Sequence, residues 1–144
     1  MIRNQIKSYF TTDVLTADPH KLVLMCYEGA IFQLRVAKNK IAGKDFEAKA
    51  NAISKTQGII SELAGVLDFE KGGAIAKNLD ALYNYIQRRL LHINLNNDSE
   101  VIDEVIGILH ELESAWEQIG SKKKHAGIPQ TQNYSQTPRQ RAYA

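Results

Sequence analysis

The chain has 144 residues, of which 44% are hydrophobic and 24% charged, as expected for one globular domain. No apolar run approaches the roughly 18 residues needed to cross a bilayer, and Met1–Phe10 contains no apolar signal region. The single cysteine, Cys26, excludes an internal disulfide framework and is typical of a reducing compartment. We therefore expect a soluble, cytoplasmic protein without membrane insertion.

The net charge of +2 is the balance of two regions of opposite sign. Residues 1–120 carry 13 Lys and Arg against 16 Asp and Glu, whereas residues 121–144 carry 5 basic residues and no acidic one. Residues 121–144 are also rich in Gln, Ser, Thr and Pro, a composition that cannot bury a core. We predict a basic, polar, disordered tail there. A solubilising tail is favoured over a nucleic-acid site, because the rest of the chain is net acidic and shows no nucleic-acid module.

Residues 1–17 are predicted to form a short N-terminal docking arm. Ile6 and Tyr9 are three residues apart, so they share a face if this segment forms a helical turn. So short a helix is marginal on its own, and the segment is ordered only if it docks on something. A frayed terminus remains the alternative.

The first long helix is predicted from Pro19 to about Ile41, ending near Gly43. Asp18 suits its N-cap, and Pro19 suits its first position, where a backbone N–H is not needed. Its first turns are apolar around almost the whole circumference, so either the arm or a partner must cover one side. The apolar residues of these turns are Leu22, Val23, Leu24, Met25, Cys26, Tyr27, Ala30, Ile31 and Phe32.

The second and third helices are predicted over about 45–68, with Asp45 as cap, and 73–94. The pair Gly72-Gly73 suits a chain reversal that needs φ > 0, so the two helices must lie antiparallel. The third helix has a single apolar stripe, which predicts one strongly buried side. That stripe consists of Ile75, Leu79, Leu82, Tyr83, Ile86, Leu90 and Ile93.

The fourth helix is predicted from a capping box formed by Asn97 and Glu100 to about Gly120. Its apolar residues spread over about 180°, wider than a bundle helix needs for its own core. Ile59 and Val66 also flank the apolar stripe of the second helix. The predicted fold is all-α, an antiparallel up-down four-helix bundle over residues 18–120, with apolar surface left over.

The sequence contains few residues in patterns that are typical of an enzyme. The Glu-x-x-His pairs of a di-iron bundle, a cysteine pair for zinc, a phosphate-binding glycine loop and a serine elbow are all missing. Cys26 lies among apolar residues, where a thiol is a packing group, and His92 and His110 are interpreted as solvated or partly packed. We therefore expect no enzyme activity, no cofactor and no metal. Apolar surface beyond the core is instead typical of a protein that binds an amphipathic segment of a partner.

A series of short motifs occurs in a fixed order along roughly residues 6–119. These motifs are Tyr9, Val14 to Pro19, Leu22 to Ile31, Asn51, Lys55, Gln57, Ile59-Ile60, Glu62-Leu63, Leu67-Asp68, Gly72-Gly73, Ile75-Ala76, Asn78-Leu79, Leu82-Tyr83, Tyr85-Ile86, Arg88 to Leu90, Asn94, Glu104-Val105 and Ala115-Trp116. Their order resembles the flagellar secretion chaperone family FliS. Asp18, Cys26 and Glu28 depart from the usual Ser, Leu and Asp of that family, and Asp18 keeps the capping role.

The resemblance implies a cytosolic export chaperone. Such a protein binds the disordered C-terminal region of flagellin, prevents premature polymerisation and keeps the cargo competent for flagellar type III secretion. It also implies the anti-sigma factor FlgM and the flagellar export gate as further partners. An apolar residue and a Tyr near the N-terminus, matched here by Ile6 and Tyr9, would cover the cargo site when it is empty and would contact or release the cargo when the site is occupied.

The remaining cargo-binding residues are expected in grooves of the bundle surface. On the first helix and its approach we expect Leu15, Leu22, Met25 and Ile31; on the third we expect Tyr83, Ile86 and Leu90, for which a core position is the competing interpretation. Two other classes of function stay open. A structural or adaptor bundle would pair with another protein without binding flagellin, and an enzyme would have a polar pocket with paired titratable groups.

Overall fold

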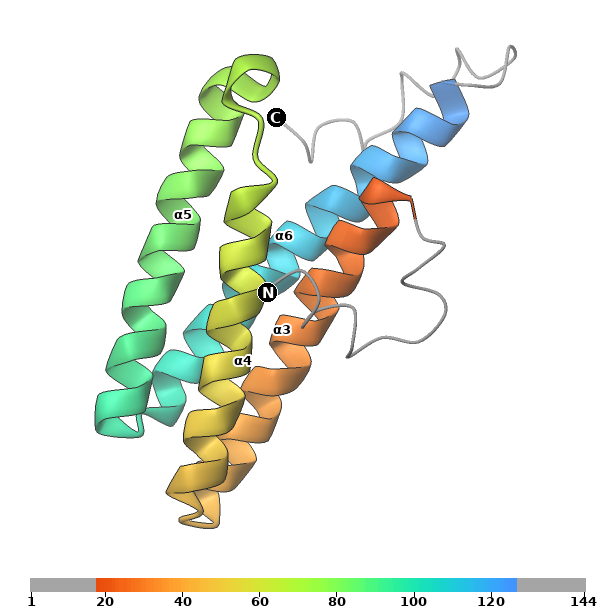
Figure 1. Ribbon diagram of the computed structural model, residues 1–144. Helices are drawn as coiled ribbons and strands as arrows, with labels where there is room; N and C mark the ends of the chain where they lie inside the picture. The colour runs from red at the N-terminus through yellow and green to blue at the C-terminus, as the bar shows by residue number, and fades with distance from the viewer. Residues whose placement is uncertain (1–17, 127–144) are drawn as a thin grey trace.

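The computed structural model describes the backbone of residues 18–126 and the side chains of residues 18–120. These residues form α3 (Pro19–Ala42), α4 (Phe46–Gly65), α5 (Phe69–Asn96) and α6 (Ser99–Ala126). Consecutive helices run antiparallel and are joined by short connections (Figure 1). The predicted all-α, up-down four-helix bundle is confirmed. The predicted arm, with Ile6, Tyr9 and Leu15, lies outside the described residues.

Aspartate side chains begin the first three helices. The Asp18 carboxylate accepts a hydrogen bond from the backbone N–H of Lys21 at 2.7 Å, and the Asp45 carboxylate accepts one from Ala48 at 3.1 Å. Each bond satisfies a backbone donor that has no partner inside the helix, so both predicted caps are confirmed. Pro19 takes the first helical position, and α3 ends at Gly43.

The joint between α4 and α5 differs in detail from the prediction. Asp68 is the cap of α5, because its carboxylate accepts from the backbone N–H groups of Glu70 and Lys71 at 3.1 and 3.0 Å. The helix therefore begins at Phe69, before the glycine pair, and is kinked at Gly73. Gly73 has φ +51° and ψ −126°, so the expected positive φ lies at this glycine, where a side chain would be strained.

The fourth helix begins at Ser99, close to its predicted start, but its cap and its C-terminal end differ from the prediction. Asn97 has φ +53° and ends α5, whereas the Asp98 carboxylate accepts from the backbone N–H of Val101 at 3.3 Å and begins α6. At the other end α6 continues past Gly120 to Ala126. Gly120 serves close packing instead of termination, because a Cβ there would clash with the His20 imidazole. Residues 121–126 of the predicted tail thus have helical backbone, and the rest of the tail lies outside the described residues.

The core runs along the bundle between all four helices. Burying a large apolar side chain contributes about 1.5–3 kcal/mol, so the buried apolar residues of this core supply most of the driving force for folding. Cys26 lies in the same core, where burial, and secondarily the Glu62 carboxylate, raises the thiol pKa to about 12. The thiol is thus a packing group, as predicted. The largest fully buried apolar residues are Tyr27, Leu34, Ile53, Ile59, Ile60, Ile86, Leu90, Ile93, Ile102, Leu109 and Val105.

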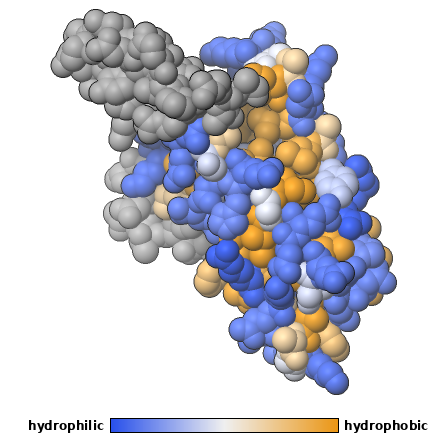
Figure 2. All heavy atoms as spheres, turned by 180° about the vertical axis from the view of Figure 1, so that it is seen from behind, coloured by the Kyte–Doolittle hydropathy of each residue, from blue (hydrophilic) through white to orange (hydrophobic). Residues whose placement is uncertain are grey.

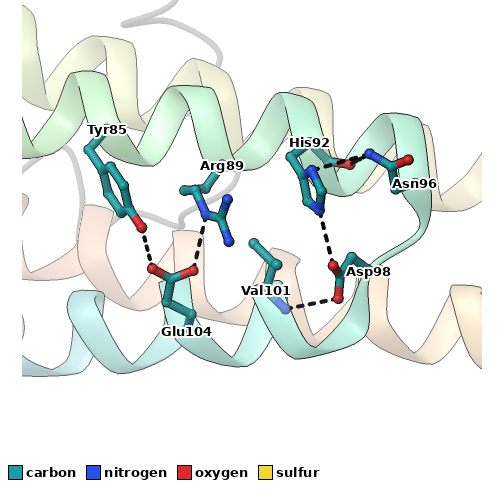
Figure 3. Close-up of polar contacts among 7 residues, drawn as sticks. All are labelled: Tyr85, Arg89, His92, Asn96, Asp98, Val101 and Glu104. Atoms are coloured by element: carbon teal, nitrogen blue, oxygen red, sulfur yellow. Dashed lines mark hydrogen bonds and ion pairs between the residues drawn. The ribbon is translucent and has the colours of Figure 1, made fainter.

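We call the end of the bundle with the C-termini of α3 and α5 the closed end. Here the buried Lys49 amine donates to the backbone oxygen and the side-chain oxygen of Asn94, at 2.8 and 2.9 Å, and ties α4 to α5. Nearby, His92 of α5 bonds the Asp98 carboxylate at 3.0 Å (Figure 3).

Candidate functional site

The opposite end of the bundle, which we call the open end, contains an apolar groove. The helix pair α3–α6 diverges from the pair α4–α5 towards this end (Figure 1), and the groove of about 920 Å³ lies where the start of α3, the end of α4, the start of α5 and the end of α6 meet. Its lining residues are Pro19, His20, Leu22, Val23, Tyr27, Leu63, Val66, Leu67, Asp68, Lys71, Gly72, Ile75, Ala76, Leu79, Tyr83, Trp116 and Ile119.

The lining divides into a buried floor and accessible walls. Tyr27, Leu63, Ala76 and Tyr83 are buried although they line the groove, so they form its floor. Most other apolar lining residues are half-buried, among them Leu22, Val23, Leu79 and Trp116. Val66 and Ile75 are 47% and 71% exposed. Hydrophobic side chains also gather on the surface seen in Figure 2, in a band bordered by hydrophilic residues.

One wall of the groove is built by a contact between α3 and α6. The rings of His20 and Trp116 stack with their centroids 5.2 Å apart, and the Trp116 indole N–H donates to the backbone oxygen of His20 at 3.2 Å. Gly120 follows one turn later on α6 and leaves room for the imidazole. The glycine therefore allows α3 and α6 to approach closely, and the stacked rings hold Trp116 at the groove.

A pair of tyrosines crosses the floor of the groove. The hydroxyl of Tyr27 on α3 and that of Tyr83 on α5 are 2.6 Å apart and share a hydrogen bond. Burial raises the pKa of both phenols above the ordinary value, so both keep their protons at neutral pH. Between them, these hydroxyls provide a polar spot in a lining that is otherwise mostly hydrocarbon.

Charge is sparse at the groove. Among Asp, Glu, Lys and Arg residues, the groove lining contains Asp68 and Lys71. The Asp68 carboxylate caps α5. Charged side chains make contacts elsewhere on the bundle. Between α5 and α6, for example, Glu104 accepts from the Tyr85 hydroxyl and from the Arg89 guanidinium (Figure 3). These contacts, the Tyr85 hydrogen bond first, lower the pKa of Glu104. The groove thus suits an apolar ligand better than a charged one.

The predicted cargo-binding residues fall into three positions. Leu22 and Tyr83 line the groove, and Met25 is half-buried on α3 outside the lining. Ile31, Ile86 and Leu90 are buried in the core, with exposed fractions of 4% or less, so the structure does not bring them to the groove. For Ile86 and Leu90 the reason is their place on α5, where the bundle closes around them.

Sequence reasoning missed several groove residues. Ile75 and Leu79 were assigned to the buried stripe of the third helix, yet both line the groove, because the helices diverge at this end. For Val66 the sequence did indicate apolar surface outside the core, since this residue flanks the apolar stripe of its helix without belonging to it. Trp116 belonged to the wide apolar arc of the fourth helix, and that excess width was the signal.

The described part of the chain shows no metal or membrane site. Within it, no group of three or more His, Cys, Asp and Glu side chains is arranged to hold a metal ion. None of the four described helices combines the length and the hydropathy that a membrane-spanning segment needs. The groove, with its mostly apolar lining, is the candidate site, and its chemistry is that of apolar burial.

An open apolar groove on a small helical bundle defines a class of protein that binds a segment of another protein. Comparison with known families makes this specific: residues 2–123 match the family model described as flagellar protein FliS. The chain belongs to this family. It is a flagellar secretion chaperone, which agrees with the resemblance noted in the sequence.

Relatives from distant bacteria support the assignment. The flagellar secretion chaperone FliS of Salmonella typhimurium is 46% identical over 110 residues, which cover 76% of this chain and 82% of the relative. The protein of the same name from Vibrio cholerae is 40% identical, covering 72% of this chain and 76% of the relative. That of Bacillus subtilis is 35% identical over 124 residues, covering 85% and 92%. The similarity therefore spans the bundle and its groove.

Proposed function

We propose that this chain binds the disordered C-terminal region of flagellin in the cytoplasm and prevents its premature polymerisation. Flagellin would stay competent for export by the flagellar type III apparatus. The apolar groove of about 920 Å³ at the open end carries this proposal. Membership of a flagellar secretion chaperone family supports a flagellar client, and the mostly apolar lining of the groove supports a segment that buries apolar side chains there.

The groove fits one face of an amphipathic helix. Such a segment places apolar residues at intervals of three and four, and these would pack between Leu22 and Val23 on one wall and Ile75 and Leu79 on the other. A flagellin segment that folds on binding would bury its apolar side chains here and leave its polar face in water. Burial of these side chains would also block the contacts that polymerisation needs.

The N-terminal arm fits this proposal as a cover for the groove. Pro19 and His20 line the groove at the very start of α3, so residues 1–17 are tethered at its edge. Ile6 and Tyr9 would occupy the apolar lining when the client is absent, and Leu15 would contact it close to the tether. Replacing both Ile6 and Tyr9 by Ala should then change the affinity for flagellin.

Two further partners belong to the same proposal. We extend it to the anti-sigma factor FlgM and to the flagellar export gate, the gate being reached through the chaperone–flagellin complex. These partners rest on family resemblance, and their binding would be measured by the same calorimetry as flagellin.

Titration calorimetry tests the proposal. The ligand is a peptide of the last ~50 residues of flagellin from the same organism, long enough for the large buried areas of coupled folding and binding. Binding of one peptide per chain with a large negative heat capacity change is expected, and a scrambled peptide of the same composition should not bind. Equal binding of both peptides, or of neither, would contradict the proposal.

A further inference from the structure

The tyrosine pair in the floor of the groove has one hydrogen more than it uses. Each hydroxyl has one hydrogen to donate, and a single hydrogen bond joins the two at 2.6 Å. Whichever hydroxyl donates to the other, the second hydrogen has no acceptor among the described residues. Tyr27 and Tyr83 are only 2% and 3% exposed, so this hydrogen lies in the buried floor of the groove.

The unpaired hydrogen affects the binding free energy once a ligand fills the groove. Water can accept the hydrogen while the groove is open to solvent, but an apolar ligand expels that water. A buried donor without an acceptor then costs about 1–3 kcal/mol. A ligand that brings an acceptor to the tyrosines avoids this cost, whereas a wholly hydrocarbon ligand does not.

The pair joins two helices that are not neighbours in the bundle. Tyr27 lies on α3 and Tyr83 on α5, helices at diagonal corners that make far fewer contacts with each other than with α4 and α6. The pair is therefore a polar bridge between diagonal helices, formed by two residues that line the groove. Core packing alone would be served as well by two phenylalanines of nearly the same shape.

We propose that Tyr27 and Tyr83 select client segments that carry a hydrogen-bond acceptor among their apolar residues. The acceptor is either a polar side chain, such as Ser, Thr, Asn or Gln, or a backbone carbonyl that the bound helix leaves unpaired. The inference rests on the proposed binding of flagellin in this groove. It adds a specificity device to a surface that otherwise recognises only hydrophobicity.

The pKa values of the two phenols support this role. Burial raises both above the ordinary value, so the pair stays neutral and keeps both hydrogens at neutral pH. The pair therefore offers its second hydrogen to the ligand. The phenol oxygens can still accept, but a client that brings only a donor leaves this hydrogen without an acceptor. A lone donor on a client, such as an indole N–H, would gain less at this site.

The test compares Tyr27→Phe/Tyr83→Phe with the unmodified chain, using the flagellin C-terminal peptide as probe. The double variant should bind about five- to tenfold more weakly, the loss of one hydrogen bond. Each single variant keeps one hydroxyl that can still donate to the client, so both singles should retain most of the affinity. Tyr85→Phe is the matched control, because Tyr85 lies on α5 outside the groove lining and bonds Glu104 instead.

A scan of the peptide separates the two sources of the acceptor. If a polar side chain accepts, its replacement by Ala weakens binding to the unmodified chain but not to the double variant. If a backbone carbonyl accepts, no single peptide position shows this coupling although the double variant still binds more weakly. Urea unfolding of each variant shows that the bundle is intact.

The possible results separate the role of the two tyrosines from the proposed binding of flagellin. If the unmodified chain does not bind the peptide, the proposed function fails. If it binds, and the double variant binds as tightly or more tightly, the selection role of the tyrosines is overturned while the function stands. Weakening equal to that of Tyr85→Phe would overturn it in the same way.

Discussion

The two ends of the bundle differ in how the same four helices pack. At the closed end, polar side chains such as Lys49, Asn94, His92 and Asp98 bind one another across helix boundaries. At the open end the helices diverge, and apolar side chains such as Val66 and Ile75 line a groove and remain 47% and 71% exposed. The closed end thus stabilises the fold, and the open end keeps apolar surface available for binding.

The largest effect should distinguish core from groove on one helix. Ile86→Ala removes a fully buried side chain of α5 and should lower the free energy of unfolding by about 2–5 kcal/mol. Ile75→Ala, at a 71% exposed groove position, should change it by only about 0.5 kcal/mol or less. Urea denaturation measures both. Equal losses would show that Ile75 packs in the core and that the open end is closed in solution.

A second effect concerns the buried amine of the closed end. Lys49→Met keeps the apolar stem but removes both hydrogen bonds to Asn94, and it should cost about 1.5–3 kcal/mol. Lys77→Met on α5 is the control, because Lys77 is exposed and should be nearly neutral. Affinity for the flagellin peptide should be unchanged in both variants. A loss of affinity in Lys49→Met alone would show that the two ends are coupled.

The kink at the open end provides a third effect. Gly73→Ala places a side chain at φ +51° and ψ −126° and should cost about 1–2 kcal/mol. Gly107→Ala is the matched control, since it lies within α6 with open space around its Cβ position. That change should stabilise the protein by about 0.5–1 kcal/mol. Thermal unfolding compares the two, and a stabilising Gly73→Ala would exclude the kink.

The smallest effect is electrostatic. Contacts with Tyr85 and Arg89 lower the pKa of Glu104, so these contacts favour the ionised carboxylate in the folded state. The contacts therefore stabilise the folded protein fully at pH values above the ordinary glutamate pKa of about 4.5. This stabilisation is lost as the pH falls through the lower pKa that Glu104 has in the folded state. Glu104→Gln should therefore flatten the acid side of the stability curve. Identical curves from pH 3 to 6 (roughly the range in which glutamates titrate) would contradict this.

The sequence predicted the fold well because the fold depends on local signals. Asp18 with Pro19 and the Asp45 cap marked two helix starts, and the apolar stripe of α5 identified Ile86 and Leu90 as candidate core residues. The C-terminal end of α6 was missed for a physical reason. Gly120 is required by the imidazole of His20, which is distant in sequence, and helix-end rules do not include such a contact.

The site was harder to predict because divergence of helices is a tertiary property. Periodicity assigns Ile75 and Ile86 to one stripe, although one lies in the groove and the other in the core. No local pattern shows where along a stripe the facing helix departs. The useful signals were indirect: the wide apolar arc containing Trp116, and Val66 beside the stripe of its helix.

The central claim is that the open end, and not merely exposed apolar surface, binds the client. Ile75 and Leu95 lie on the same helix at opposite ends and are equally exposed, at 71% and 72%. Ile75→Gln and Leu95→Gln should be titrated calorimetrically with the flagellin C-terminal peptide. Ile75→Gln should bind the peptide about 10- to 100-fold more weakly, because one apolar side chain is no longer buried by the client, and Leu95→Gln should bind it unchanged. Equal weakening, or weakening by Leu95→Gln alone, would contradict the claim.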